Sequence, residues 1–363
     1  MNKKIKALVL VLVFTLVTSI LAACGAAKVE IGIVLPTKDE TRWVQDEERF
    51  LAAIKDSKYK TEVLFSQGSS AKELENVEAL ISKGIKVLII CPFDGDAAGK
   101  AVEAAKKAGV TVISYDRLIT GTEAVDYYVT FDSLSVGAAQ AQYLVDNASG
   151  QAGQPLYLYA GAATDNNAFI FFEGAWKVLQ PKIADGTFVV ANSSEAEALK
   201  DKQDLSRDEM SKIIGQVTTN WEANEAKNKA QTHLTASNLK GDVLVLAPND
   251  GTSRALSDVF ATDSAITSYV TSGQDADKAS IQYIIDEKQS MTVLKDVRIL
   301  VKDAIDMAFN VLENKTVSTT GEYDNGVKKV PAKQTDVKTV NKNNVKELII
   351  DSGYYEASEF IGL

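Results

Sequence analysis

A carboxylate and a guanidinium stand side by side in the segment VTVISYDRLITG, where Asp116 and Arg117 follow an apolar run rich in β-branched residues. Such a run is typical of a buried strand, so the charges at its end need an explanation. One explanation is a local ion pair or a solvated turn. The other is a site that holds a polar ligand, because the carboxylate accepts hydrogen bonds and the guanidinium donates them.

The other predicted strands end in residues of the same kinds. These strand-end residues are polar, with one aromatic residue among them: Arg42, Trp43, Asp94, Asp165, Asn166, Asn167, Asn249, Asp250 and Asp275. In open parallel sheets, ligands bind beyond the carboxyl ends of the strands. The set contains no nucleophile–base pair. It favours a sugar, because carboxylates and amides bind hydroxyl groups and an indole packs on the apolar face of a sugar ring.

Strands and helices alternate along the chain. Strands are predicted at 29–36, 61–66, 86–91 and 110–114, with helices at 44–55, 71–83 and 97–108. After residue 132 the alternation restarts, with helices at 136–147, 169–179, 223–234 and 252–260 and strands at 156–161, 187–191 and 242–247. This pattern predicts an α/β protein with two doubly wound parallel sheets in tandem. We expect the polar stretch 192–211 to be an irregular surface excursion.

The first 23 residues predict a secretion signal. Lysines precede an apolar run at residues 7–21, which is followed by two alanines and Cys24. The segment LAAC (21–24), at the end of the apolar run, resembles the bacterial lipobox, in which the cysteine becomes the lipidated first residue of the mature chain. We therefore expect residues 24–28 to be a lipid-anchored N-terminus that holds the protein on the outer face of the cytoplasmic membrane without spanning it.

The composition excludes several classes of function. A net charge of −10 argues against nucleic-acid binding, for which a basic face is expected. Apart from Cys24 there is one cysteine, Cys91, on an apolar strand, and the one histidine is His233. We therefore expect no disulfide within the chain, no metal site, no cofactor and no catalytic residue.

A series of motifs makes the chain resemble a known family. The motifs are RW (42–43), YDR (115–117), TFD (130–132), DNNA (165–168), SGQDAD (272–277), TVLKD (292–296), NGVKKVP (325–331) and DSGYY (351–355). They occur in the order seen in the D-xylose-binding and multiple-sugar-binding proteins of bacterial ABC transporters, which are type I periplasmic solute-binding proteins. The resemblance extends over residues 29–360. It implies ligand contacts from Arg42, Trp43, Asp116, Arg117, Asn166, Asn167, Trp221, Asn249, Asp275 and Lys295.

The resemblance also implies two lobes joined by three hinge crossings, near residues 131–134, 294–296 and 323–327. The N-terminal lobe would comprise residues 29–132 and 296–325. The C-terminal lobe would comprise residues 133–295 and 326–363. Each lobe is then discontinuous in sequence.

The leading interpretation is a monomeric, non-enzymatic receptor that captures a monosaccharide, xylose or a related pentose or hexose, and delivers it to the permease of an ABC importer. An alternative is the receptor arm of a chemotaxis or two-component system. A more remote alternative is an extracytoplasmic glycoside hydrolase, which needs two carboxyl groups on opposite sides of one scissile bond. A repressor of the same core fold is excluded by the signal and by the lack of a DNA-reading N-terminal module.

Overall fold

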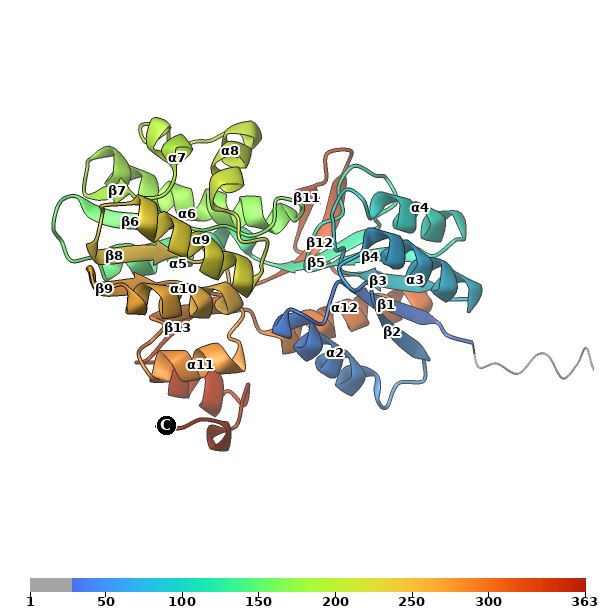
Figure 1. The fold of residues 1–363 in the computed structure, drawn as a ribbon. Coiled ribbons are helices and arrows are strands. Elements are labelled where there is room, and N and C mark those ends of the chain that lie inside the picture. The colour runs from blue at the N-terminus through green and yellow to red at the C-terminus, as the bar shows by residue number, and fades with distance from the viewer. Residues whose placement is uncertain (1–27) are drawn as a thin grey trace, which may run out of the picture.

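Two parallel sheets, one in each lobe, organise residues 28–363, the part of the chain that the computed structural model describes (Figure 1). The predicted α/β class with two doubly wound lobes is confirmed. Among residues 28–363, no helix has the length and apolarity needed to cross a membrane. The predicted signal and Cys24 lie outside the described residues.

The N-terminal lobe contains a seven-stranded sheet with the order β11-β12-β5-β4-β3-β1-β2. Its strands are β1 (Ile31–Leu35), β2 (Thr61–Phe65), β3 (Val87–Ile90), β4 (Thr111–Tyr115), β5 (Tyr127–Phe131), β11 (Gly321–Asp324) and β12 (Lys329–Thr335). The neighbours are parallel except for the β11–β12 hairpin. The helices α2 (Thr41–Ile54) and α12 (Val297–Leu312) pack in one buried cluster, and α3 (Ser70–Ser82) and α4 (Gly99–Lys107) in another. This coverage of both faces explains why β1 is apolar throughout.

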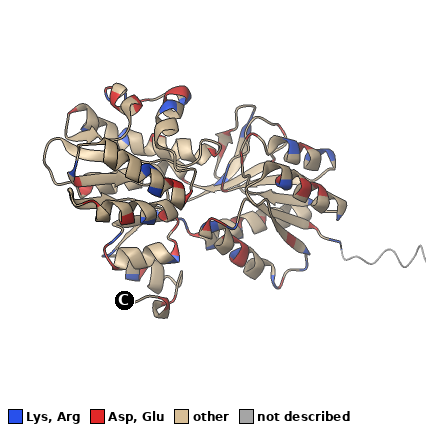
Figure 2. Cartoon of the chain, viewed as in Figure 1, with Lys and Arg blue, Asp and Glu red and all other residues tan. Residues whose placement is uncertain are grey.

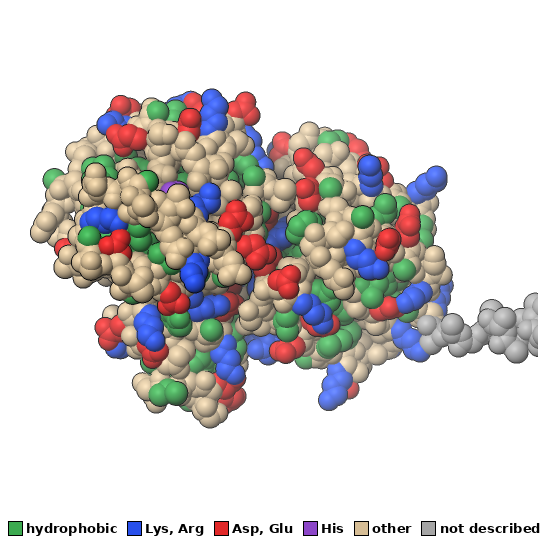
Figure 3. Space-filling model, in the orientation of Figure 1, with side chains coloured by type: hydrophobic (Ala, Val, Ile, Leu, Met, Phe, Trp, Pro, Cys, Tyr) green, Lys and Arg blue, Asp and Glu red, His purple; other side chains and the backbone are tan. Residues whose placement is uncertain are grey.

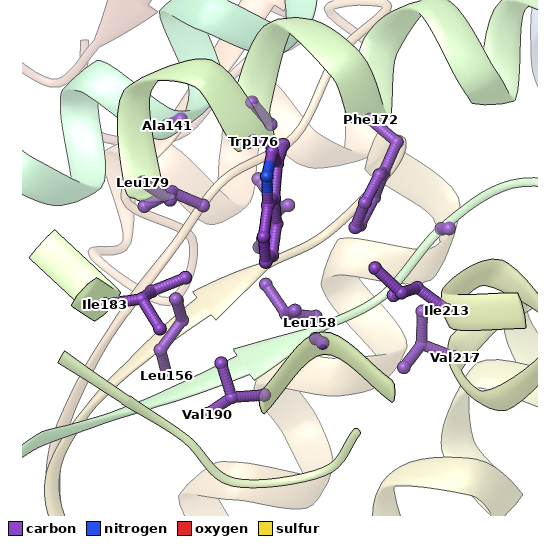
Figure 4. Close-up of a cluster of buried hydrophobic side chains, with 14 of the residues drawn as sticks. Ala141, Leu156, Leu158, Phe172, Trp176, Leu179, Ile183, Val190, Ile213 and Val217 are labelled. Atoms are coloured by element: carbon purple, nitrogen blue, oxygen red, sulfur yellow. The ribbon is translucent and has the colours of Figure 1, made fainter. Parts of the chain in front are cut away.

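The C-terminal lobe contains a four-stranded parallel sheet with the order β7-β6-β8-β9. Its strands are β6 (Gln154–Leu158), β7 (Phe188–Val190), β8 (Gly241–Leu246) and β9 (Ile266–Thr271). Its helices are α5 (Ser133–Asp146), α6 (Asn166–Ala184), α7 (Ser194–Ala198), α8 (Arg207–Val217), α9 (Ala223–Ala236), α10 (Asp250–Thr262) and α11 (Lys278–Ile285). Figure 4 shows the cluster on one face, where Trp176 and Phe172 of α6 lie above Leu158 of β6.

The C-terminal segment returns to this second lobe. Strand β13 (Lys338–Asn341) pairs antiparallel with β10 (Met291–Leu294), and a π-helical turn (Lys346–Asp351) and a 3-10 turn (Ala357–Glu359) follow. Ile349 and Tyr354 of this segment are buried in one cluster with Ile281 and Ile284 of α11. The C-terminal segment therefore packs on the second lobe.

The lobe boundary predicted at residues 325/326 is wrong. Strand β12 pairs with β5, so residues 329–335 belong to the first sheet and the third crossing lies between Thr335 and Lys338. The NGVKKVP segment contains the turn of the β11–β12 hairpin and the start of β12. In the turn, Gly326 has a φ of +87° and the side chain of Asn325 accepts from the backbone N–H of Lys328. Asn-Gly is a hairpin signal, and here it marks a turn and not a hinge.

The stretch 192–211 is also more ordered than predicted. It contains α7 and the start of α8, and the buried side chains of Ala196 and Met210 join the cluster around α6. The indole of Trp176 donates to the carbonyl of Lys202 at 2.9 Å. Short polar helices carry too few apolar residues to reveal a buried face in the sequence.

Candidate ligand-binding cleft

A cavity lies between the lobes and is lined by residues of both. The lining residues are Glu40, Arg42, Trp43, Asp116, Arg117, Asp165, Asn167, Phe171, Trp221, Asn249, Gln274, Asp275 and Lys295. All the ligand residues predicted from the sequence are among them except Asn166. The structure therefore brings together side chains from seven separate loops and helix starts, as expected at the carboxyl edge of parallel sheets.

Arg42 enters the cavity from the first turn of α2, and its side chain is held by a hydrogen bond within its own lobe. Its Nε donates to Oδ2 of Asp46 at 2.6 Å, one helical turn further along α2. Asp46 is fully buried and also accepts from the hydroxyl of Tyr115. Burial alone would lower the pKa of Arg42, but Asp46 and the two carboxylates of the cavity raise it well above its usual value. The guanidinium is therefore fixed and charged.

Asp116 is neither solvated nor paired with its neighbour. Only 4% of its surface is exposed, and its Oδ2 accepts from Nη2 of Arg42 at 2.8 Å. Burial would raise the pKa of its carboxyl, but Lys295, Arg42 and Arg117 outweigh that effect and lower it. The backbone of Asp116 has a φ of +60°, an unfavourable conformation for any residue other than glycine.

The carbonyl group of Asp116 explains how that backbone is held. It accepts from the hydroxyls of Tyr128 at 2.6 Å and Thr130 at 3.1 Å, both on β5. It also accepts from the side-chain amide of Asn167, in the other lobe, at 2.9 Å. These contacts aim the Asp116 carboxylate into the cavity.

Arg117 is 5% exposed and pairs across the cleft. Its Nε lies 2.9 Å from Oδ2 of Asp165 in the second lobe, and its Nη2 donates to Glu40 at 3.3 Å. Its guanidinium lies 4.9 Å from the ring centre of Trp43. Asp116 and Arg117 thus have different partners, so the explanation of these charges as a local ion pair or a solvated turn is wrong.

The N-terminus of α6 supplies Asp165 and Asn167 to the cavity. Asp165 caps the helix, since its side chain accepts from the backbone N–H of Asn167 at 2.9 Å. Burial raises the pKa of Asp165 to about 6, although Arg117 opposes the shift. Asn166 lies elsewhere: its Oδ1 accepts from Arg207 at 2.7 Å. Asn166, which the resemblance implies as a ligand contact, therefore does not line the cavity, because successive residues of a helix point about 100° apart.

Asp275 and Asn249 complete the polar part of the second lobe. Asp275 pairs with Lys295 at 2.8 Å and with Arg42 of the first lobe at 3.4 Å. Its φ of +101° is a second strained backbone position at the cavity. Asn249 caps α10 and accepts from the backbone N–H of Thr252 at 3.2 Å.

Two indoles face the cavity from opposite lobes, Trp43 on α2 and Trp221 before α9. Trp221 packs edge-on against Phe171 and directly over Gly161, where an added Cβ would lie 2.0 Å from the indole. Within residues 28–363, Nε1 of both tryptophans and Oε1 of Gln274 have no hydrogen-bond partner. Buried polar atoms are normally satisfied, so these atoms favour a ligand with hydroxyl groups.

Sequence reasoning missed several of these residues. Asp165 is in the strand-end set but not among the predicted ligand residues, and the sequence motifs do not single out Glu40, Phe171 or Gln274. Two of them carry a usable signal. Phe171 lies one helical turn after Asn167, and Gln274 directly precedes Asp275 within SGQDAD.

The remaining reactive residues lie outside the cavity. Cys91 is buried in the core of the first lobe, and His233 is on α9, where burial lowers its pKa to about 4. Among the described residues, no group of three or more potential metal-ligating side chains is found. The carboxylates that line the cavity are paired with Arg42, Arg117 and Lys295. This arrangement holds a polar molecule but offers no nucleophile activated by a base.

Comparisons with known proteins agree with this geometry. Residues 31–316 match the model of the family described as periplasmic binding protein domain. The chain is 35% identical to the multiple sugar-binding periplasmic protein SbpA of Azospirillum brasilense, over 92% of this chain and 91% of that protein. It is 30% identical to the D-xylose-binding periplasmic protein of Escherichia coli, over 96% of this chain and 98% of that protein.

A solved structure is more similar still. It is a carbohydrate transporter solute-binding protein from Chloroflexus aurantiacus in complex with D-glucose, and it is 66% identical to this chain. The match has a TM-score of 0.91 and covers 93% of this chain and 100% of the other.

Proposed function

The chain belongs to the periplasmic binding protein family, and we propose that it is the monosaccharide receptor of a sugar ABC importer. It is a binding protein and not an enzyme. The observation that carries the proposal is the cavity itself, in which two lobes contribute charged hydrogen-bonding groups and one indole each. A receptor that encloses its ligand in this way must open to take it up and to release it to the permease.

The side chains divide into donors, acceptors and ring contacts. In the proposed complex, the carboxylate of Asp116 accepts from two hydroxyls of the sugar, and Arg42, Arg117 and Lys295 donate to ring or hydroxyl oxygens. The amides of Asn167 and Asn249 can do both. Trp43 and Trp221 hold the two faces of the ring between them, a contact that excludes open-chain polyols of the same size.

We propose an aldopyranose as the ligand, with D-glucose and D-xylose as the first candidates. The proposal is supported by the bound D-glucose of the similar Chloroflexus protein and by the D-xylose named for the Escherichia coli relative. Titration calorimetry of residues 25–363 against D-glucose, D-xylose, D-galactose and L-arabinose tests it, with D-mannitol as the control. We expect saturable binding of at least one aldopyranose and no heat with mannitol. Absence of binding by every monosaccharide would contradict the proposal.

We further propose that Cys24 carries the lipid anchor of the receptor. The support is the LAAC segment after the apolar run of residues 7–21. Replacing Cys24 by Ser should release the protein from the membrane with its sugar affinity unchanged, because the cavity is built from residues after 39. Fractionation after a carbonate wash measures this, and a variant that stayed with the membrane would contradict the anchor.

A further inference from the structure

We propose that the hydroxyl of Tyr355 is a latch between the lobes, which positions two sugar-binding side chains at once in the closed receptor. Tyr355 ends the DSGYY motif, outside the cavity lining. The inference rests on the proposed function, because its effect is on sugar binding.

Tyr355 belongs to the second lobe but reaches the first. Its segment is anchored in the second lobe by the β10–β13 pairing and by the burial of Ile349 and Tyr354 against α11. Its hydroxyl accepts from Nε2 of Gln45, on α2 of the first lobe, at 2.8 Å. The same hydroxyl donates to the carbonyl of Ala276, in the second lobe, at 3.1 Å. A single oxygen therefore joins a helix of one lobe to a loop of the other.

Both ends of this bridge adjoin residues of the cavity. Gln45 is on the same helix as Arg42, within its second turn, and Ala276 directly follows Asp275. Arg42 and Asp275 form an ion pair across the cleft at 3.4 Å. The bridge thus fixes the distance between the elements that carry the two partners of that pair.

The loop that contains Ala276 needs such support. Asp275 and Ala276 both have positive φ angles, +101° and +54°, although neither is glycine. Backbone conformations of this kind persist only where surrounding contacts hold them. The backbone N–H of Asp275 is held by the carbonyl of Val293, and the carbonyl of Ala276 by Tyr355. Loss of the hydroxyl removes one of these restraints.

Tyr354 differs from Tyr355 in its surroundings. The guanidinium of Arg298, in the first turn of α12, lies 5.1 Å from the ring centre of Tyr354, and Arg298 also donates to the carbonyl of Ser352. Arg298 directly follows the second crossing, between Leu294 and Val297, where a hinge motion displaces atoms least. Tyr354 also contacts α2, because its backbone carbonyl accepts from Nη2 of Arg49 at 3.3 Å. The contact of Tyr355 with Gln45 differs in that the side-chain hydroxyl makes it, so a Tyr→Phe change removes it.

The test compares two Tyr→Phe variants that each lose one hydroxyl. Tyr355→Phe removes the contact between the lobes, whereas Tyr323→Phe removes a hydrogen bond to Gln334 within the first lobe. Both tyrosines are half-buried. For Tyr355→Phe we expect the Kd for the sugar found by calorimetry to rise about 3- to 10-fold, mainly through faster dissociation. Without sugar, the Tm of Tyr355→Phe should fall no further than that of Tyr323→Phe, because each variant loses one hydrogen bond within a lobe. Tyr323→Phe should bind sugar like the wild type.

A second variant tests whether the effect comes from the hydrogen bond between Gln45 and Tyr355 or from a change in side-chain packing. Gln45→Met removes the other half of the contact, and the double variant with Tyr355→Phe should lose no more affinity than Tyr355→Phe alone. Wild-type affinity in Tyr355→Phe, or losses that add in the double variant, would overturn the proposal. Failure of the wild-type protein to bind any monosaccharide would instead overturn the proposed function.

Discussion

The two walls of the cleft are built differently. The side chains of the first-lobe wall are held by their own lobe: Asp46 holds Arg42, and Tyr128 and Thr130 hold the backbone of Asp116. The carboxylates of the second-lobe wall find basic partners in the first lobe, since Asp165 pairs with Arg117 and Asp275 with Arg42.

The difference indicates an order of events. The first-lobe wall keeps its arrangement when the lobes are apart, because its supporting contacts are internal. On opening, the second-lobe wall loses the basic partner of Asp165 and one of the two basic partners of Asp275. We therefore expect the sugar to bind first to Arg42, Trp43 and Asp116, and the second lobe to close over it, which stabilises the closed population.

The largest loss of sugar affinity is expected from substitutions of Asp116 and Arg117 in the first-lobe wall. Asp116→Asn keeps the shape of the side chain but removes its charge and replaces one acceptor by a donor. Affinity should fall roughly 10- to 1,000-fold, because a buried hydrogen bond to a charged group contributes about 1.5–3 kcal/mol and 1.4 kcal/mol is tenfold. Arg117→Met should give a loss of similar size. Calorimetry measures both, and wild-type affinity in the two variants would refute their assignment to the site.

A smaller loss is expected from the residue that supports Arg42. Asp46→Asn leaves the Arg42 guanidinium with a weaker partner, so affinity should fall about 10-fold and the Tm should drop as well. Glu73→Gln is the matched control, because Glu73 is a fully buried acid of the same lobe outside the cavity lining. If both variants kept full affinity, the first wall would not depend on internal support.

The acidic residues next to the cavity predict that the protein binds anionic sugars more weakly than neutral ones. Asp39, Glu40 and Glu222 line a chamber that adjoins the cavity, and acidic side chains gather along the seam between the lobes in Figure 3. Elsewhere, basic and acidic residues are interspersed over both lobes (Figure 2). D-glucuronate should therefore bind several-fold more weakly than D-glucose at low ionic strength, and added salt should narrow the gap. Competition titrations at two salt concentrations measure this. Equal affinities for D-glucuronate and D-glucose would show that these acidic residues do not discriminate between charged and neutral sugars.

Much of the first wall could be predicted from the sequence, because strand periodicity places YDR and RW at strand ends on one edge of a sheet. Trp221 and Lys295 could be predicted only from the resemblance to a family, since no local pattern aims them at the cavity. The choice between Asn166 and Asn167 depended on the exact start of α6, which composition does not determine.

Other features depend on contacts between distant parts of the chain. The β12–β5 pairing moves residues 329–335 into the first lobe, and nothing near NGVKKVP indicates its partner strand. Asp46 could have been found from its spacing of four residues after Arg42, whereas the Tyr355–Gln45 contact joins residues 310 positions apart. Local periodicity carries no information about such pairs.

Small-angle scattering can show whether the two lobes close over the sugar. The measurement compares the wild-type protein without sugar and at a concentration that calorimetry shows to be saturating. We predict a smaller radius of gyration with sugar, because closure brings Asp165 and Asp275 to their partners in the first lobe. Identical scattering curves at saturation would show that the lobes do not close over the sugar.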